Sequence, residues 1–228
     1  MRDSESDMLS ASMRPQEYER IREILSDLRP EHTLEIGMAN GGSSVVICNA
    51  LRTLGRGRHT AIDPFQSSAQ GWLGKGIEAV CQADLASYCE VIEDYDYLAL
   101  PQLVAEHRQY DFILIDGWHS FDYTLLNLFY ADFLLCCGGV LAVHDTGLPA
   151  VHKACKFLES HKQYQRIGPP ISVGLKSLPK RITRRVLQLF SGPHQMKEAK
   201  CRREKWFSLG AYRKVQDHQV GNEFFANF

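Results

Sequence analysis

Residues 32–44 read H-T-L-E-I-G-M-A-N-G-G-S-S, and this stretch decides the fold. A short apolar run ends at Ile36, a glycine-rich turn follows, and a helix is predicted to open at Ser43 or Ser44. A strand, a turn and a helix in this order place backbone N–H groups and the positive end of the helix dipole against a ligand. The stretch therefore predicts the first strand-helix unit of a ligand-binding α/β sheet.

The alternation of strand and helix continues to about residue 167. Strands are predicted at residues 33–36, 59–62, 89–92, 112–115, 140–143 and 164–167, with a last one near 211–215. Helices are predicted at residues 15–28, 43–54, 77–87, 101–109, 122–135 and 149–158. Alternating elements with short connections are typical of a doubly wound α/β fold, whose mostly parallel sheet carries helices on both faces.

We interpret the 228 residues as a single domain with four parts. They are an N-terminal covering segment (1–30), a core (31–167), a basic insertion (168–208), and a last strand with a tail (209–228). Within the insertion, residues 178–190 read L-P-K-R-I-T-R-R-V-L-Q-L-F, which predicts a basic amphipathic helix. That helix would suit a substrate lid, a dimer arm, a membrane-surface helix, or a solvated helix packed on the acidic part of the chain.

Charge is distributed unevenly along the chain. Residues 1–150 hold 10 Lys and Arg against 22 Asp and Glu, whereas residues 151–228 hold 16 against 5. The sequence shows no aromatic interleaving and no RNA-binding motif, so we expect no nucleic-acid partner. We interpret the asymmetry as attraction within a monomer or a homodimer. Contact of the basic residues 176–205 with an anionic membrane surface stays an alternative.

The cysteine pattern and the N-terminal stretch predict a cytoplasmic location. Seven cysteines without a C-x-x-C pair do not form a disulfide framework, so we expect reduced thiols. Residues 1–12 lack the apolar core of a secretory signal, and no apolar run approaches membrane-spanning length.

The glycine turn does not have the spacing of a dinucleotide site. Ala39 stands where the G-x-G-x-x-G pattern requires its second glycine. The carboxylate of Glu35, beside the turn, would repel a pyrophosphate but would suit a ligand that carries an ammonium group. The methionine end of S-adenosylmethionine fits that description. The pattern therefore disfavours a nicotinamide-dependent oxidoreductase.

Four acidic residues are predicted at the ligand-binding edge of the sheet, where strands end: Glu35, Asp63, Asp116 and Asp145. Asp63 would accept hydrogen bonds from both hydroxyls of a ribose. Residues 93–96, which include Asp94, are expected to border the adenine. Ser43, at the predicted start of the helix, and Asp116 complete the candidate cofactor-binding residues.

The densest group of candidate catalytic residues is D-G-W-H (116–119), which faces His144 at the end of the next strand. Adjacent strands lie about 4.8 Å apart, so these side chains can converge on one pocket. His119 is the candidate base for an acceptor hydroxyl, with Asp116 orienting it or the acceptor. Alternatively, Asp116 and Asp145 would hold Mg²⁺, although the preference of Mg²⁺ for oxygen makes His144 an awkward ligand. His144 would then replace the metal as a second proton acceptor or as a hydrogen-bond donor.

Residues 31–167 resemble a class I S-adenosylmethionine-dependent methyltransferase, of the group similar to macrocin and other sugar O-methyltransferases. The resemblance depends on four stretches: L-E-I-G-M-A-N-G-G-S-S (34–44), A-I-D-P-F (61–65), Y-D-F-I-L-I-D-G-W-H-S-F-D-Y (110–123) and C-G-G-V-L-A-V-H-D-T (137–146). The first two are widespread in the superfamily. D-G-x-H followed by G-G-V-x-x-x-H-D is more specific.

The resemblance implies a seven-stranded sheet of order 3-2-1-4-5-7-6, with strand seven antiparallel. It also implies that Glu35, Gly37, Gly41 and Asp63 line the cofactor site. In the macrolide-sugar members, an aspartate matching Asp116 and an acidic pair after strand five bind Mg²⁺, and a histidine matching His119 is the base. This chain has His144 in place of the first acid of that pair, which puts the metal in doubt.

The sequence therefore predicts transfer of a methyl group from S-adenosylmethionine to a hydroxyl of a sugar-containing or other small natural-product acceptor. Two alternatives stay open at this point. One is a metal-dependent hydroxylase of the cephalosporin-hydroxylase type, which shares the scaffold. The other is a non-catalytic cofactor-binding scaffold whose basic segment docks on a partner.

Overall fold

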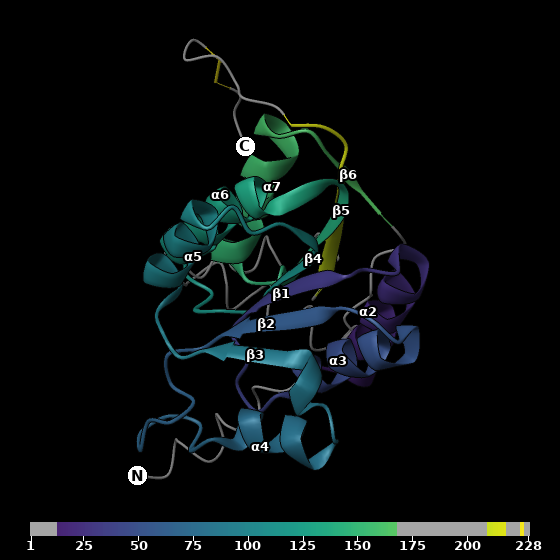
Figure 1. The fold of residues 1–228 in the computed structure, drawn as a ribbon. Coiled ribbons are helices and arrows are strands. Elements are labelled where there is room, and N and C mark those ends of the chain that lie inside the picture. The colour runs from purple at the N-terminus through teal and green to yellow at the C-terminus, as the bar shows by residue number, and fades with distance from the viewer. Residues whose placement is uncertain (1–12, 168–208, 218–223, 226–228) are drawn as a thin grey trace, which may run out of the picture.

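A computed structural model describes residues 13–167, 209–217 and 224–225. Its strands form one seven-stranded sheet of order β3-β2-β1-β4-β5-β7-β6, as predicted (Figure 1). The strands are β1 His32–Ile36, β2 Arg58–Ile62, β3 Cys89–Ile92, β4 Tyr110–Ile115, β5 Leu135–His144, β6 Tyr164–Arg166 and β7 Leu209–Lys214. Neighbouring strands among β1 to β5 are parallel to each other. Strand β7 runs antiparallel to both β5 and β6, which confirms the expected direction of the last strand.

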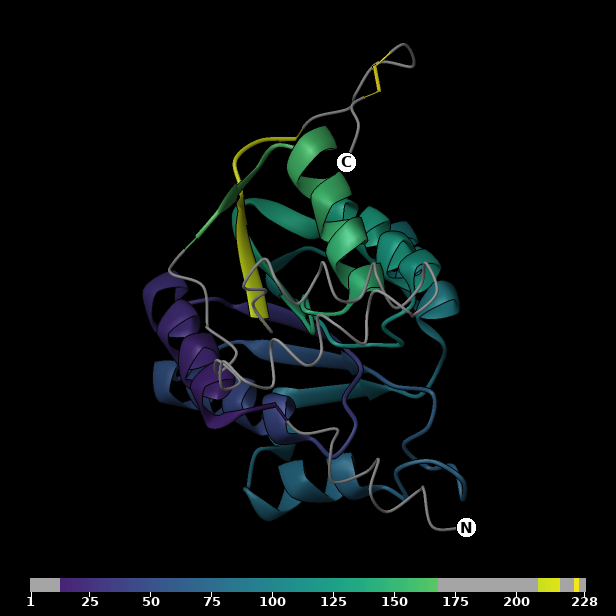
Figure 2. The ribbon, with the colours of Figure 1, turned by 180° about the vertical axis from the view of Figure 1, so that it is seen from behind.

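Helices cover both faces of the sheet (Figures 1 and 2). They are α2 Pro15–Leu28, α3 Gly42–Leu54, α4 Lys75–Gln82, α5 Asp96–Ala105, α6 Phe121–Leu134 and α7 Pro149–His161, with a 3₁₀ turn at Ala86–Tyr88. On one face, α2 and α3 bury Ile21, Leu25 and Ile47 against Phe112 and Leu114 of β4. On the other face, α5, α6 and α7 form a larger apolar core. These two cores hold the carboxyl ends of the central strands in a fixed arrangement.

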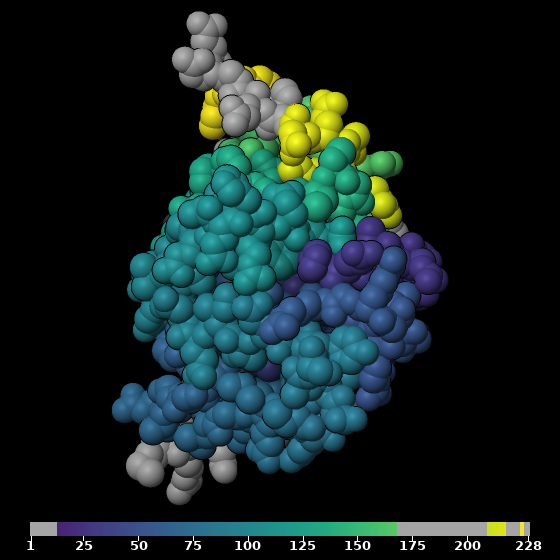
Figure 3. Space-filling model, in the orientation of Figure 1, coloured from purple at the N-terminus to yellow at the C-terminus, as the bar shows by residue number. Residues whose placement is uncertain are grey.

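Helix α2 closes one side of this arrangement. In the space-filling view its purple atoms reach the surface between the blue atoms near α3 and the green and yellow atoms of the last strands (Figure 3). The helix begins at Pro15, which suits a first helical position because the missing N–H would have no partner there. It ends at Arg29, whose left-handed backbone returns the chain toward β1.

Several predicted elements have different bounds in the structure, among them the helix predicted at 77–87, which is α4 and ends at Gln82. The helix predicted at residues 101–109 is α5, which starts at Asp96 and contains Pro101 in its interior. Burial of Ala99, Leu100 and Leu103 in the larger core outweighs the local preference of proline for a helix start.

The strand predicted at 140–143 begins earlier, at Leu135, because the glycine pair 138–139 lies inside β5 rather than before it. The register between β4 and β5 shifts at this point, and Gly138 has a φ of 85°. A glycine in a left-handed conformation at a register shift is typical of a bulge, which sequence periodicity does not reveal.

Residues 168–208, with the helix predicted at 178–190, lie outside the described residues. Among those that the structure does describe, none of the helices is long and apolar enough to span a membrane.

At Gly37, directly after β1, the backbone packs against the backbone of Asp116, directly after β4. Gly37 has a φ of 95°, and an added Cβ would overlap the carbonyl oxygen of Asp116. The amide of Asp116 donates to the carbonyl of Ile36 at 2.8 Å, and the amide of Gly37 donates to the carbonyl of Ile62 at 2.9 Å. The turn after β1 and the loop after β4 are therefore in direct contact only because residue 37 has no side chain.

We predict that Gly37→Ala lowers the free energy of unfolding by about 3 kcal/mol, since it adds overlap with fixed backbone to an unfavourable φ. Gly55→Ala is the matched control, because Gly55 also has a positive φ (70°) but nothing lies within 4 Å of the added Cβ. It should lose only about 1 kcal/mol. Urea unfolding of both variants measures the difference, and equal losses would mean that the close approach at Gly37 does not matter.

Candidate active site

The turn after β1 has an unusual backbone. Gly37, Ala39 and Gly41 all have positive φ values, of 95°, 48° and 79°. Such a conformation is unfavourable for alanine and persists only where surrounding groups hold it. Here Oδ2 of Asp63 accepts hydrogen bonds from the amides of Met38, at 3.1 Å, and Ala39, at 2.8 Å. The acid at the end of β2 therefore fixes the shape of the turn.

Hydrogen bonds of Asp63 and Gln66 connect the turn after β1 with the loop after β2 and the start of α4. Asp63 is 4% exposed, and its Oδ1 accepts from the amide of Phe65 at 2.9 Å. Gln66 is completely buried and donates to the carbonyl of Ala39 at 2.8 Å, while its Oε1 accepts from the amide of Gly76. The sequence predicted that Asp63 binds a ribose, and it gave no role to Gln66. The structure adds that both side chains organise the glycine turn.

Glu35 lies beneath the turn rather than at its open edge. Side chains alternate along β1, so Thr33 and Glu35 point toward α3, and Glu35 is completely buried. Its Oε2 accepts a hydrogen bond from the hydroxyl of Ser44 and faces Nε2 of His59 at 3.2 Å. The other ring nitrogen of His59 lies 2.9 Å from the hydroxyl of Thr33. A series of contacts between polar side chains thus connects β1 and β2 to the first turn of α3.

Two further predicted cofactor residues occupy the edges of the site. Ser43 is buried in the first turn of α3, but it is the neighbouring Ser44 that bonds to Glu35. Asp94 is half-buried and accepts from the amide of Tyr95, just before α5. Sequence reasoning missed Ser44 and His59, although a histidine within a buried strand next to Glu35 was a usable signal.

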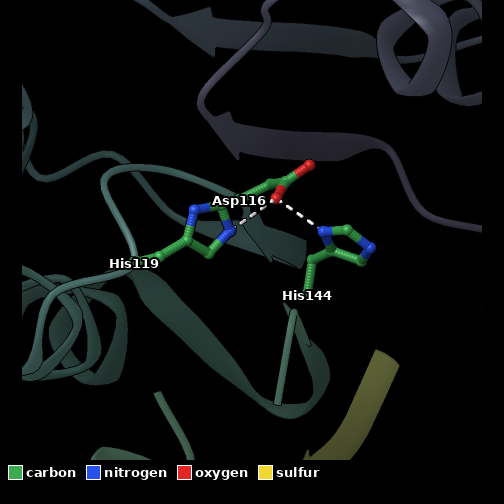
Figure 4. Close-up of side chains that lie close together, drawn as sticks. All are labelled: Asp116, His119 and His144. Carbon is green, nitrogen blue, oxygen red and sulfur yellow. Dashed lines mark hydrogen bonds and ion pairs between the residues drawn. The ribbon is translucent and has the colours of Figure 1, made fainter. Parts of the chain in front are cut away.

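Asp116, His119 and His144 come together at the ends of β4 and β5, as predicted (Figure 4). Both imidazoles turn toward one carboxylate oxygen. Asp116 Oδ1 lies 2.8 Å from His144 Nδ1 and 3.2 Å from His119 Nε2. His119 has a φ of 57°, a left-handed conformation that is costly for a residue with a side chain and that recurs at functional sites. The loop is therefore held in a shape that aims His119 at Asp116.

The hydrogen bonds define which ring atoms carry protons. A carboxylate only accepts, so His119 Nε2 donates to Asp116, and the lone pair of the neutral ring is on Nδ1. His144 faces a carboxylate at each nitrogen, because its Nε2 lies 3.3 Å from Glu17 Oε2. A ring that donates from both nitrogens is an imidazolium.

The pKa shifts agree with this assignment. Burial lowers the pKa of His144, but its hydrogen bonds to Asp116 and Glu17 outweigh burial and raise it to about 10. Burial raises the pKa of Asp116, but the two histidines lower it overall. His144 is therefore charged at neutral pH and Asp116 is ionised.

The donor set does not fit Mg²⁺. Within the described residues, the group of three side chains whose ligand atoms lie within 4.8 Å of one another is Asp116, His119 and His144, and Asp145 is not part of this group. Mg²⁺ prefers oxygen ligands, whereas this group offers two imidazoles, one of which is committed to two carboxylates. Asp145 instead faces His119 Nε2 at 3.5 Å.

Helix α2 adds two residues that sequence reasoning did not assign to the site. Glu17 contacts His144, and it falls on the same helix face as the buried Ile21 and Ile24, so a carboxylate on an apolar stripe was the available signal. Tyr18 places its hydroxyl where a Cβ of Gly42 would lie. Burial, followed by the charges of Glu35 and Asp116, raises the pKa of Tyr18.

A small hollow lies beside the two histidines. It opens between the ends of β4 and β5 and the first turns of α6 and α7, and it is lined by Ile115, Gly117, Trp118, His119, Thr124, Asn127, Val143, His144 and Val151. The space inside the hollow is too small to admit a ligand, so it shows only which side chains surround the two histidines.

The raised pKa of His144 predicts a pH-dependent contribution to stability. Because the folded pKa of about 10 exceeds the unfolded value of 6.5, the contribution is complete below pH 6.5 and is lost as the pH rises through 10. Urea unfolding of wild type and His144→Gln should therefore give a difference in free energy that shrinks between pH 7 and pH 10. His32→Gln, at an exposed histidine, is the control. A constant difference for His144→Gln would contradict the charged state.

Comparison with known proteins agrees with the geometry. Residues 34–146 match the model of a family described as a methyltransferase domain. None of the curated proteins matches the chain significantly in sequence.

Solved structures resemble the fold at low sequence identity. The O-methyltransferase TomG from Streptomyces achromogenes, involved in tomaymycin synthesis and solved with S-adenosylmethionine, has a TM-score of 0.64 and 14% identity, over 90% of this chain and 82% of that one. An O-methyltransferase from Bacillus cereus in complex with S-adenosylhomocysteine has a TM-score of 0.64 and 13% identity, over 92% and 86%. With the sheet order, the glycine turn and the family match together, the chain belongs to the class I S-adenosylmethionine-dependent methyltransferases.

Proposed function

We propose that this methyltransferase transfers the methyl group of S-adenosylmethionine to a hydroxyl of a small-molecule acceptor. The observation that carries the proposal is the pairing of His119 Nε2 with Asp116, which leaves Nδ1 of a half-buried histidine free to accept a proton beside the glycine turn. The similar structures from Streptomyces achromogenes and Bacillus cereus are both O-methyltransferases, which supports the same reaction type.

The cofactor is expected against the turn at residues 37–41. The backbone amides there and the start of α3 provide donors for its carboxylate, and Asp63, at the end of β2, is the acceptor next to the ribose. Glu35 Oε1 is buried and has no hydrogen-bond partner among the described residues. A buried carboxylate oxygen without a donor is costly, and a ligand ammonium group would supply one.

The chemical step requires alignment and one proton acceptor. The acceptor oxygen attacks the methyl carbon, the C–S bond breaks as the C–O bond forms, and the electron pair of the C–S bond returns to sulfur. The proton of the acceptor hydroxyl goes to Nδ1 of His119, and Asp116 stabilises the resulting imidazolium through Nε2. Holding donor carbon and acceptor oxygen about 3 Å apart supplies several kcal/mol of the barrier.

His144 has a different part in this scheme from the one that the sequence suggested. Both of its nitrogens donate to carboxylates, so it cannot act as a second proton acceptor. Instead it is a fixed positive charge that holds Asp116 in place. The donor set that disfavours Mg²⁺ also gives no support to a metal-dependent hydroxylase. The paired His119 favours an enzyme over a non-catalytic scaffold.

The acceptor class is inferred from the side chains around His119. They include the apolar Val143 and Val151, the polar Thr124 and Asn127, and Trp118, which is 68% exposed. A ring that is apolar on its faces and hydroxylated at its edge suits such neighbours. We therefore propose a sugar-containing or other small natural product as acceptor.

We predict that His119→Ala lowers the rate of methyl transfer by about 100-fold or more and leaves the affinity for S-adenosylhomocysteine unchanged. The rate is measured as release of S-adenosylhomocysteine, with an acceptor found by screening hydroxylated sugars and aromatic natural products. His107→Ala, at an exposed histidine in the loop before β4, is the control and should keep the wild-type rate.

The same assay run with EDTA tests the absence of a metal step, and the rate should not change. An undiminished rate in His119→Ala would remove this residue from the mechanism. A loss of activity with EDTA that Mg²⁺ restores would overturn the metal-free scheme.

A further inference from the structure

Helix α2 supplies a buried carboxylate to the cluster of Asp116, His119 and His144. Glu17 is only 1% exposed, and its Oε2 lies 3.3 Å from Nε2 of His144, a residue 127 positions away in the sequence. Charged side chains are almost never this buried unless they are paired. The contact therefore links the N-terminal helix to the site over β4 and β5.

Glu17 is fixed from its own side by the start of α2. The same Oε2 accepts a hydrogen bond of 2.7 Å from the amide of Arg14, the residue before the helix, and the first turn of a helix favours a negative charge. An ionised carboxylate oxygen has no proton to donate, so Glu17 Oε2 accepts from both the Arg14 amide and the His144 ring. His144 Nε2 is thus the donor in this contact.

The groups around the His144 ring leave it little freedom. Asp116 holds Nδ1 from the end of β4, Glu17 holds Nε2 from α2, and Asp145 Oδ1 lies 4.0 Å from Nε2. The ring of His119 stands 6.3 Å away, at an interplanar angle of 67°. Glu17 is the group that makes the second nitrogen a donor, because Asp145 is beyond hydrogen-bonding distance.

We propose that Glu17 is a positioning residue of the active site, which orients Asp116, and through it His119, by holding the ring of His144. This inference builds on the proposed methyl transfer. With Nε2 held by Glu17, Nδ1 stays directed at Asp116 Oδ1, the same oxygen that accepts from His119 Nε2. The order of contact is then Glu17, His144, Asp116 and His119, so the base is aligned from the N-terminal helix.

Three variants separate positioning from simple capping of α2. Glu17→Ala removes the acceptor for both Arg14 and His144. Glu17→Gln keeps an acceptor oxygen for the helix cap and the ring but removes the negative charge. Glu19→Gln is the matched control on the same helix, because the side chain of Glu19 is 63% exposed and pairs with Arg22 at the surface.

The expected result is a loss in kcat without a matching loss in cofactor binding. Glu17→Ala should lower kcat by about 10- to 100-fold and change KM for S-adenosylmethionine by less than about twofold, since misplacing a base costs rate rather than affinity. Glu17→Gln should recover part of that loss, and Glu19→Gln should match wild type. Wild-type kcat in both Glu17 variants would overturn the proposal.

A spectroscopic arm needs no acceptor. Nitrogen-15 NMR of the histidine rings, in the complex with S-adenosylhomocysteine at pH 8, should show both His144 nitrogens protonated in wild type and one deprotonated in Glu17→Ala. An unchanged His144 signal in that variant would contradict the role of Glu17 even if no acceptor is found. Should Glu17→Ala fail to fold, Glu17→Gln carries the kinetic measurement, and a wild-type kcat in it would then overturn the proposal. If wild type transfers no methyl group but the His144 signal changes as expected, then the proposed reaction fails while the contact stands.

Discussion

The contact between the backbones at Gly37 and Asp116 is the constraint on which the site depends. It brings the turn that is expected to hold the cofactor against the loop that carries the candidate base, with no side chain between them. A methyl transfer has little tolerance for separation between donor and acceptor, so the two loops must meet at close range. The absence of a Cβ at residue 37 makes that meeting geometrically possible.

Polar groups under the turn then keep its unfavourable backbone in place. Asp63 accepts hydrogen bonds from two backbone amides of the turn. Glu35 accepts a hydrogen bond from Ser44 at the start of α3. His59 also contacts Glu35 in the interior, and Thr33 contacts the other ring nitrogen of His59. Buried polar networks are stable only when their members find partners, which explains why so many polar residues lie beneath one short turn.

A second group of polar side chains lies at the ends of β4 and β5. Glu17, His144, Asp116 and His119 form one continuous series of contacts between the N-terminal helix and the loop after β4. The imidazolium of His144 occupies the centre of this group, next to carboxylates that would otherwise repel one another. The positive charge of His144 thus lies between the carboxylates of Asp116 and Glu17.

Much of the fold could be predicted from local signals. At residues 32–44, the spacing of apolar residues and the glycines between them predict a strand, a turn and a helix. The sheet order followed from the resemblance of the motifs. The start of α5 and the bulge at Gly138 escaped prediction because tertiary packing and strand register decide them.

The candidate site shows the same division. The meeting of Asp116, His119 and His144 could be predicted because all three end neighbouring parallel strands or follow them directly. The direction of the Glu35 side chain and the arrival of Glu17 from α2 could not, because they depend on strand alternation and on a contact across 127 residues. Long-range contacts of single side chains leave only weak traces in a sequence.

The central claim is that the turn at residues 37–41 receives the amino-acid end of a sulfonium cofactor and not a pyrophosphate. Isothermal titration calorimetry of the full chain with S-adenosylhomocysteine, and separately with NAD, tests it most directly. The account predicts saturable binding of S-adenosylhomocysteine at one site per chain and no heat of binding with NAD. Binding of NAD without binding of S-adenosylhomocysteine would contradict it.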